Sequence, residues 1–169
     1  MSIAAILREL EQESATTRRV LERVPEEKLS WKPHPKSMTL GELALHVAQS
    51  PGYIASNWCL KEVVQFGGGG ETPKPSSRQQ ILAAHDESAE KTKDVLTQLG
   101  DEGLHQMWRG EAGGVKVFEM PKAALVRSIV LNHTYHHRGQ LSVYLRLLDV
   151  PVPAIYGPSA DESPIAART

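Results

Sequence analysis

The chain has 169 residues, of which 40% are hydrophobic and 23% charged, with a formal net charge of −1. A chain of this size can bury roughly 70% of its unfolded surface, and its composition is typical of one globular domain. The near-neutral charge excludes a global field that would recruit nucleic acid or an anionic membrane, and the single cysteine, Cys59, excludes an intrachain disulfide and a cysteine-based zinc cluster.

The N-terminal stretch "MSIAAILRELEQESATTRR" turns polar too early for a signal peptide. No apolar run approaches the roughly 20 residues that a membrane helix needs. A single cysteine fits a reducing compartment. We therefore expect a soluble, cytoplasmic protein folded as one domain over residues 1–169.

Two of four long segments with a helical spacing of apolar residues lie in the N-terminal part of the chain. The first covers about residues 2–24 and ends near Pro25. The second opens at "TLGE", where Thr39 and Glu42 form a capping-box pattern. Apolar residues recur at helical spacing as far as Val63, which is the last candidate residue for this helix.

Breaks in this pattern follow from proline and glycine. Because proline donates no backbone hydrogen bond, Pro51 predicts a kink or local break near Gln49 and Ser50. The glycine- and proline-rich run "FGGGGETPKPSS" predicts a linker. A third helix is expected from about Ser77 to Gly100, a glycine at the position that commonly follows a helix end.

The C-terminal third holds the last long helix. Residues 101–120 fit either a small hairpin or a long loop, because short alternations flank a Gly-Gly pair. The fourth helix extends from Pro121 to about Leu148, and residues 149–169 form a proline-rich tail that wraps the surface or frays. The sequence thus predicts an all-α fold, an antiparallel four-helix bundle with a short irregular or hairpin segment before its last helix.

The fourth helix contains "LNHTYHHRGQ", with three histidines in five residues. His133 and His137 are separated by four positions, so on a helix they lie about 40° apart around the axis and about 6 Å apart along it. Two imidazoles on one face can bind one metal ion, whereas His136 points away from His137. The same inward stripe contains apolar residues, namely Leu125, Ile129, Leu141 and Tyr144 or Leu148.

Two known metal motifs do not fit. The spacing resembles the zinc-protease pattern H-E-x-x-H, but Thr134 stands where the glutamate that serves as general base is needed. A di-iron carboxylate bundle needs Glu-x-x-His motifs on paired helices, and the fourth helix has no glutamate at the matching position.

A third ligand should come from another helix, and His46 is our choice. It lies in "GELALHVAQ", on the apolar stripe of the second helix. Of the remaining histidines, His34 lies in a proline-flanked loop, His85 on a polar helix and His105 in the segment 101–120. Three neutral histidines leave an open coordination position, which is typical of catalytic rather than structural zinc sites.

Each of these residues also has a simpler interpretation that involves no metal. Each core-facing histidine can instead be hydrogen-bonded without a metal. His136 is expected on the surface or at a subunit contact, Cys59 as a small buried residue, and Trp58 as a packing residue or at the mouth of a pocket. Gly139, in the middle of a helix, suggests close approach by another helix.

Two segments, "LSWKPHPKSMTLGELALHVAQSPGYI" and "NHTYHHRGQLSVYLRLLDVPVPAIYG", together resemble the DinB/YfiT-like superfamily. The first is similar to that family's W-x-P turn and second helix with one histidine. The second is similar to its H-x-x-x-H-R-G-Q helix and proline-rich tail. The resemblance implies an up-down-down-up bundle and a three-histidine site at His46, His133 and His137, with a divalent metal, typically zinc or nickel.

The resemblance also implies possible partners and reactions. Many members of the family pair as homodimers, and some act as thiol-dependent transferases or isomerases, while others have been proposed as hydrolases. One thiol-dependent branch has a glutamate in place of a histidine ligand, whereas this chain has histidine at all three positions. Nothing in the sequence indicates DNA binding.

Two hypotheses follow. In the first, the metal activates a low-molecular-weight thiol or water for reaction with a small molecule, and Asn132, Tyr135, Arg138 and Gln140 are candidates for outer contacts of the site. In the second, the protein binds metal without turnover, as a sensor or for stability. A third alternative is a helical bundle that binds partner molecules and no metal. A fourth protein ligand would favour the second hypothesis, and an open position would favour the first.

Overall fold

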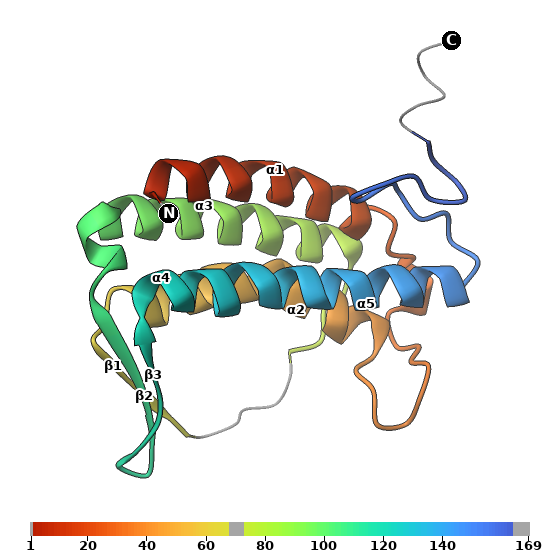
Figure 1. Ribbon diagram of the computed structural model, residues 1–169. Helices are drawn as coiled ribbons and strands as arrows, with labels where there is room; N and C mark the ends of the chain where they lie inside the picture. The colour runs from red at the N-terminus through yellow and green to blue at the C-terminus, as the bar shows by residue number, and fades with distance from the viewer. Residues whose placement is uncertain (1, 68–72, 164–169) are drawn as a thin grey trace.

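Four helical rods pack as a bundle, with a small sheet at one end (Figure 1). The computed structural model describes residues 2–67 and 73–163. The rods are α1 (Ile3–Leu21), α2 (Leu40–Ile54), α3 (Arg78–Leu104), and α4 (Lys122–Leu125) continued by α5 (His133–Leu147). In Figure 1, α1 and α5 run in one direction and α2 and α3 in the other, which is the expected up-down-down-up order.

Side chains cap the starts of α1, α2 and α3, and the cap of α2 is the one predicted in the sequence analysis. The Thr39 hydroxyl accepts a hydrogen bond from the Glu42 backbone N–H at 3.1 Å, and the Glu42 carboxylate accepts one from the Thr39 N–H at 2.8 Å. Together these two bonds complete the predicted capping box. Ser2 and Ser77 cap α1 and α3 in the simpler way, each accepting one backbone N–H. A single turn of 3₁₀ helix, Glu26–Lys28, follows α1.

Pro51 does not end the second helix near Gln49 and Ser50, because α2 continues through it to Ile54 and then widens into a π-helical turn, Ala55–Cys59. Next to the proline, the Gly52 N–H donates to the Ser88 hydroxyl of α3 at 2.8 Å. A Cβ atom at Gly52 would lie 2.8 Å from the Ser88 Cα. The glycine after Pro51 therefore allows α2 and α3 to come into close contact.

The strictly all-α prediction is wrong, because a three-stranded sheet is present. β2 (Met107–Ala112) and β3 (Val115–Pro121) form an antiparallel hairpin, so the hairpin alternative for residues 101–120 is confirmed. Gly113 and Gly114 turn it with positive φ angles of 57° and 79°. β1 (Val63–Phe66) pairs in parallel with β2, so Val63 belongs to a strand and Phe66 is not part of a linker.

Of the two remaining glycine predictions, the one for Gly100 is confirmed in part and the one for Gly139 is wrong. Gly100 interrupts the helical backbone of α3 with φ 65°, as expected at a helix end, although a short helical stretch continues to Leu104. The prediction of a close helix approach at Gly139 is wrong, because a Cβ atom there would meet nothing within 4 Å. The glycine run of the predicted linker falls on residues 68–72, which lie outside the described residues.

The last rod is not a uniform α-helix. Pro121 is the residue before α4 and also ends β3. Between α4 and α5 the chain forms a π-helical segment, Val126–Asn132, so His133 is the first residue of regular α-helix beyond it. π-helical turns occur often at functional sites.

The core consists of two apolar clusters with buried polar residues between them. One cluster, at the sheet end, includes Ile6, Leu96 and Trp108, and the other, at the opposite end, includes Leu21, Leu40 and Leu145. The buried polar residues are Thr17, Ser50, His85, Ser88, Thr92, Thr134 and Arg138, together with Lys122 near the sheet. Because apolar packing at both ends supplies most of the burial, the polar middle of the bundle is free to carry functional groups.

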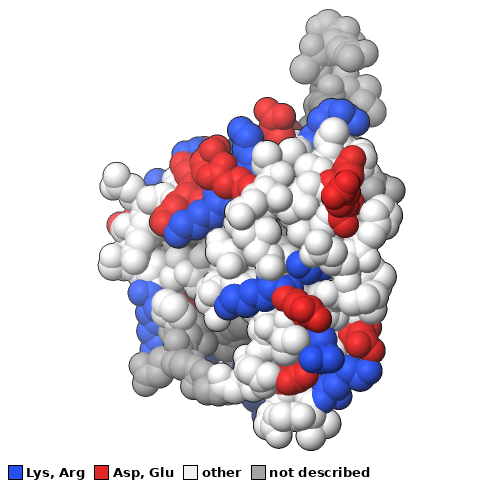
Figure 2. All heavy atoms as spheres, turned by 90° about the vertical axis from the view of Figure 1, so that its left-hand side faces the viewer, with Lys and Arg blue, Asp and Glu red and all other residues white. Residues whose placement is uncertain are grey.

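The described part of the tail wraps the surface, as predicted. Arg138 donates to the Tyr156 hydroxyl at 2.7 Å, and Arg19 donates to Glu162 at 2.6 Å, so the tail is held against α1 and α5. Residues 164–169 of the predicted tail lie outside the described residues. No helix in the described part combines the length and apolar character needed to cross a membrane. Figure 2 shows basic and acidic side chains interspersed on the face at the sheet end.

Candidate functional site: a three-histidine cluster

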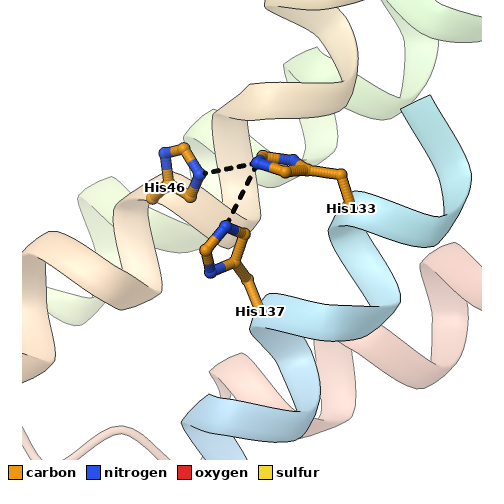
Figure 3. A group of neighbouring side chains, drawn as sticks. All are labelled: His46, His133 and His137. Atoms are coloured by element: carbon orange, nitrogen blue, oxygen red, sulfur yellow. Dashed lines mark hydrogen bonds between the residues drawn. The ribbon is translucent and has the colours of Figure 1, made fainter. Parts of the chain in front are cut away.

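His46, His133 and His137 come together between α2 and α5 (Figure 3). His46 projects from the middle of α2, and the other two project from the first two turns of α5. Each of the three is partly buried, and one ligating atom from each lies within 4.8 Å of the others. The structure thus brings together the three histidines that the sequence reasoning singled out.

The nitrogen–nitrogen distances match those of ligands that share one ion. His133 Nε2 lies 3.1 Å from His137 Nε2 and 3.4 Å from His46 Nε2. Two imidazoles bound to a tetrahedral zinc ion at about 2.0–2.1 Å would have their nitrogens about 3.3 Å apart. The positions of the side chains therefore fit a metal ion.

The hydrogen bonds within the cluster leave lone pairs directed at a common point. His137 Nδ1–H donates to Gln140 Oε1 at 2.8 Å, so in the neutral ring Nε2 carries the lone pair. In a neutral His133 ring, Nε2 carries either one proton or one lone pair. It can therefore form a well-aligned hydrogen bond with only one of its two neighbours, His46 or His137. Its Nδ1 is buried without a hydrogen-bond partner among the described residues. A cation on the Nε2 side accommodates all three rings at once.

The electrostatic environment keeps these rings neutral. Burial, and then the neighbouring rings of His137, His46 and His136, lower the pKa of His133 to about 4. Burial is also the main cause that lowers the pKa values of His46 and His137. Metal binding requires unprotonated imidazole, and these shifts provide it at neutral pH without deprotonation beforehand.

Of the four candidates for outer contacts, Gln140 is the one hydrogen-bonded to a cluster histidine among the described contacts. Asn132 is exposed. The Tyr135 hydroxyl donates to Glu9 at 3.0 Å, and the buried Arg138 pairs with Glu13 at 2.7 Å. Tyr135 and Arg138 therefore make their polar contacts with α1 and, in the case of Arg138, with Tyr156 of the tail, on another side of α5 from the histidines.

Two clefts meet at the cluster. The larger, of about 940 Å³, includes His46 and His133 in its wall, and the smaller, of about 430 Å³, includes His137 and Gln140. Met38 lines both of them. The histidines are thus open to small molecules from two sides, which is the access that a substrate site needs.

The other histidines lie elsewhere. His34, His105 and His136 are exposed, and His85 is buried in the bundle, where its Nε2 lies 3.1 Å from the Ser14 hydroxyl. Trp58, expected either as a packing residue or at the mouth of a pocket, does both, because it packs against the core cluster at the sheet end and lines the larger cleft. Sequence reasoning missed Gln49 and Asn57, which line the same cleft. Neither residue belongs to a motif, and only the fold brings them to the site.

The fold and the cluster together define a class of protein, the helical bundles that carry a three-histidine group able to bind a metal ion. Comparison with known proteins specifies the family. The family model described as DinB family matches residues 1–167, and the chain belongs to this family.

Individual relatives agree with this assignment. The chain is 30% identical over 160 residues to the uncharacterized protein YrdA of Bacillus subtilis, covering 92% of this chain and 89% of that protein. It is similar to the crystal structure of a DinB-like protein from Bacillus cereus, with a TM-score of 0.72 and 26% identity over 92% of this chain and 98% of that one. A second DinB-like structure, YjoA of Bacillus subtilis, shares the fold with a TM-score of 0.64 and 23% identity, covering 86% and 92% of the two chains.

Proposed function

We propose that the chain binds a divalent metal ion, zinc or nickel, through His46, His133 and His137, and that this site performs a metal-dependent reaction on a small molecule. The observation that carries the proposal is the convergence of three Nε2 atoms from two helices, at 3.1 and 3.4 Å. The reaction is of the thiol-dependent S-transferase type or the hydrolase type.

The number of ligands supports an enzyme rather than a structural site. No fourth histidine, cysteine or carboxylate joins the group among residues 2–67 and 73–163. When bound, a divalent ion with three imidazole ligands supplies an open position at which a thiol or water becomes a nucleophile near neutral pH. A closed site with four protein ligands would instead support the non-catalytic alternative.

The residues around the cluster would hold and orient the reacting groups. Gln140 fixes the orientation and tautomer of His137 through its hydrogen bond to Nδ1. The larger cleft gives a small molecule, including a low-molecular-weight thiol, access to His46 and His133. We also propose a homodimer as the assembly in solution, by analogy with the family, which light scattering on the purified protein will test.

The test combines metal analysis with activity. Purified protein, exchanged into zinc- or nickel-containing buffer and then desalted, should retain one ion per chain, and single alanine variants at His46, His133 and His137 should lose it. A panel of thiols with electrophiles, and of esters and amides, then tests turnover. Metal retained by all three variants would overturn the site. Stoichiometric metal without turnover on any panel member would favour the non-catalytic alternative.

A further inference from the structure

We infer that the larger cleft is a subsite for an uncharged ligand with an aromatic or similarly flat apolar group, which lies against Trp58 beside the histidine cluster. The inference rests on the proposed function for the role of the cluster, but the recognition surface itself consists of residues outside it. It specifies the substrate class that the family resemblance leaves open.

Apolar side chains form much of the wall of this cleft. The apolar residues include Tyr53 and Ile54 from α2, Trp58 from the π-helical turn that follows it, and Ile129 from the π-helical segment before α5. The same wall contains His46 and His133. A ligand in the cleft can therefore contact the apolar surface and reach the imidazole nitrogens at the same time.

Trp58 is held in a fixed orientation. It stacks on Trp108 with ring centroids 5.9 Å apart and planes 24° apart, and it meets Phe66 edge-on at 5.4 Å. Trp108 is 1% exposed and belongs to the core cluster at the sheet end, whereas Trp58 is only partly buried. A ring fixed by the core on one side and open to a cleft on the other binds a flat group with little loss of side-chain entropy.

The charges in the cleft favour an uncharged ligand. Glu87 and Lys91 are the charged side chains among its described lining residues, and they pair with each other at 2.6 Å. Outside the histidine cluster, the described lining therefore offers no cation without an acidic partner to a phosphate or carboxylate, while Gln49 and Asn57 offer neutral amides. The subsite around Trp58 is therefore suited to an uncharged part of the ligand rather than to a phosphate or carboxylate.

The first experiment uses probes that do not bind metal. Metal-free protein is titrated with benzamide, acetamide and benzoate while the indole N–H signals are followed by NMR, with the Trp58 signal assigned from Trp58→Leu. We expect benzamide to shift the Trp58 signal and to leave that of Trp31 unmoved, because Trp31 packs against Tyr144 and does not line the cleft. Acetamide and benzoate should each cause a much smaller shift. An unmoved Trp58 signal, or equal shifts with benzoate, would overturn the inference.

The second experiment links the subsite to the metal. Zinc-loaded protein is titrated by calorimetry with benzohydroxamate and acetohydroxamate, which share one zinc-binding group. Trp58→Leu should reduce the preference for the aryl compound by about tenfold, while Trp31→Leu and Trp58→Phe keep it. An unchanged preference in Trp58→Leu would refute the subsite. If the wild type binds no zinc, the proposed function fails, and the benzamide titration alone then tests whether the subsite exists. If Trp58→Leu does not fold, Ile129→Ser replaces it in the comparison.

Discussion

The hydrogen bond from His137 to Gln140 gives the sharpest test of the metal site, because it changes affinity without removing a ligand. Gln140→Leu removes the Oε1 atom that accepts from His137 Nδ1 at 2.8 Å and keeps a side chain of similar size. The imidazole then loses the partner that fixes its tautomer and makes Nε2 a better donor to metal. We expect zinc affinity to fall while all three histidines remain.

The size of the effect follows from the exposure of the pair. Loss of such a partner typically weakens metal binding by about 10–100-fold. Gln140 is exposed, so water can partly replace its oxygen, and the expected effect is at the lower end. That is about tenfold, or about 1.4 kcal/mol.

Competition with a chromogenic zinc chelator measures this difference directly. Gln140→Glu, which restores an acceptor, should recover wild-type affinity or exceed it. Gln12→Leu, on the exposed face of α1, is the matched control and should bind zinc like the wild type. If Gln140→Leu also binds zinc with wild-type affinity, then this bond does not orient His137 for metal binding, and the role assigned to Gln140 is refuted.

Three further outcomes are expected. His137→Ala should abolish stoichiometric metal while far-ultraviolet circular dichroism stays near wild type, and His136→Ala should keep its metal; the reverse pattern would mean that the assigned register is wrong. Arg138→Leu removes the cationic partner of the partly buried Glu13 carboxylate and should cost about 3 kcal/mol in urea unfolding, whereas Arg18→Leu, at an exposed ion pair, should have a much smaller effect; equal costs would contradict this. Burial lowers the pKa of His85, so the folded state takes up a proton less readily than the unfolded one. Stability should therefore decline as pH falls below about 6.5, and in urea titrations His85→Gln should make that decline less steep but not remove it, because the lowered pKa values of His46, His133 and His137 act in the same direction.

Local patterns explain what could be predicted from the sequence. The capping box at Thr39 and Glu42 and the shared face of His133 and His137 depend on three- and four-residue spacings, which a helix imposes wherever it lies in the fold. The prediction of His46 as third ligand required one further assumption, that the apolar stripe of its helix faces the same interior as the stripe that contains His133 and His137. The capping box is confirmed, and the three histidines do come together in the structure.

What could not be predicted depends on contacts distant in sequence. β1 has only four residues, and its parallel partner, β2, lies beyond the whole of α3, so Val63 resembled the end of a helix. The π-helical segment before His133 has no single-sequence signal. Arg138 follows His137 directly and is turned about 100° from it, toward α1, where Glu13 binds it. Proximity in sequence to a candidate ligand therefore did not indicate proximity to the site.

Removal of the metal separates its role in folding from its role in chemistry. The apolar clusters on either side of the polar middle are complete without an ion, so the metal-free bundle should remain folded at 25 °C. Binding should still stabilise the folded state, because the cluster joins α2 to α5 only in that state. At a free zinc concentration of 100 times Kd, linkage gives about 2.7 kcal/mol, or an increase in Tm of about 5–11 °C for a domain of this size. Scanning calorimetry with zinc, and then with excess chelator, measures this shift, and His46→Ala should show none. A metal-free protein that is already unfolded would mean that the ion holds the bundle together, and the site would then be structural.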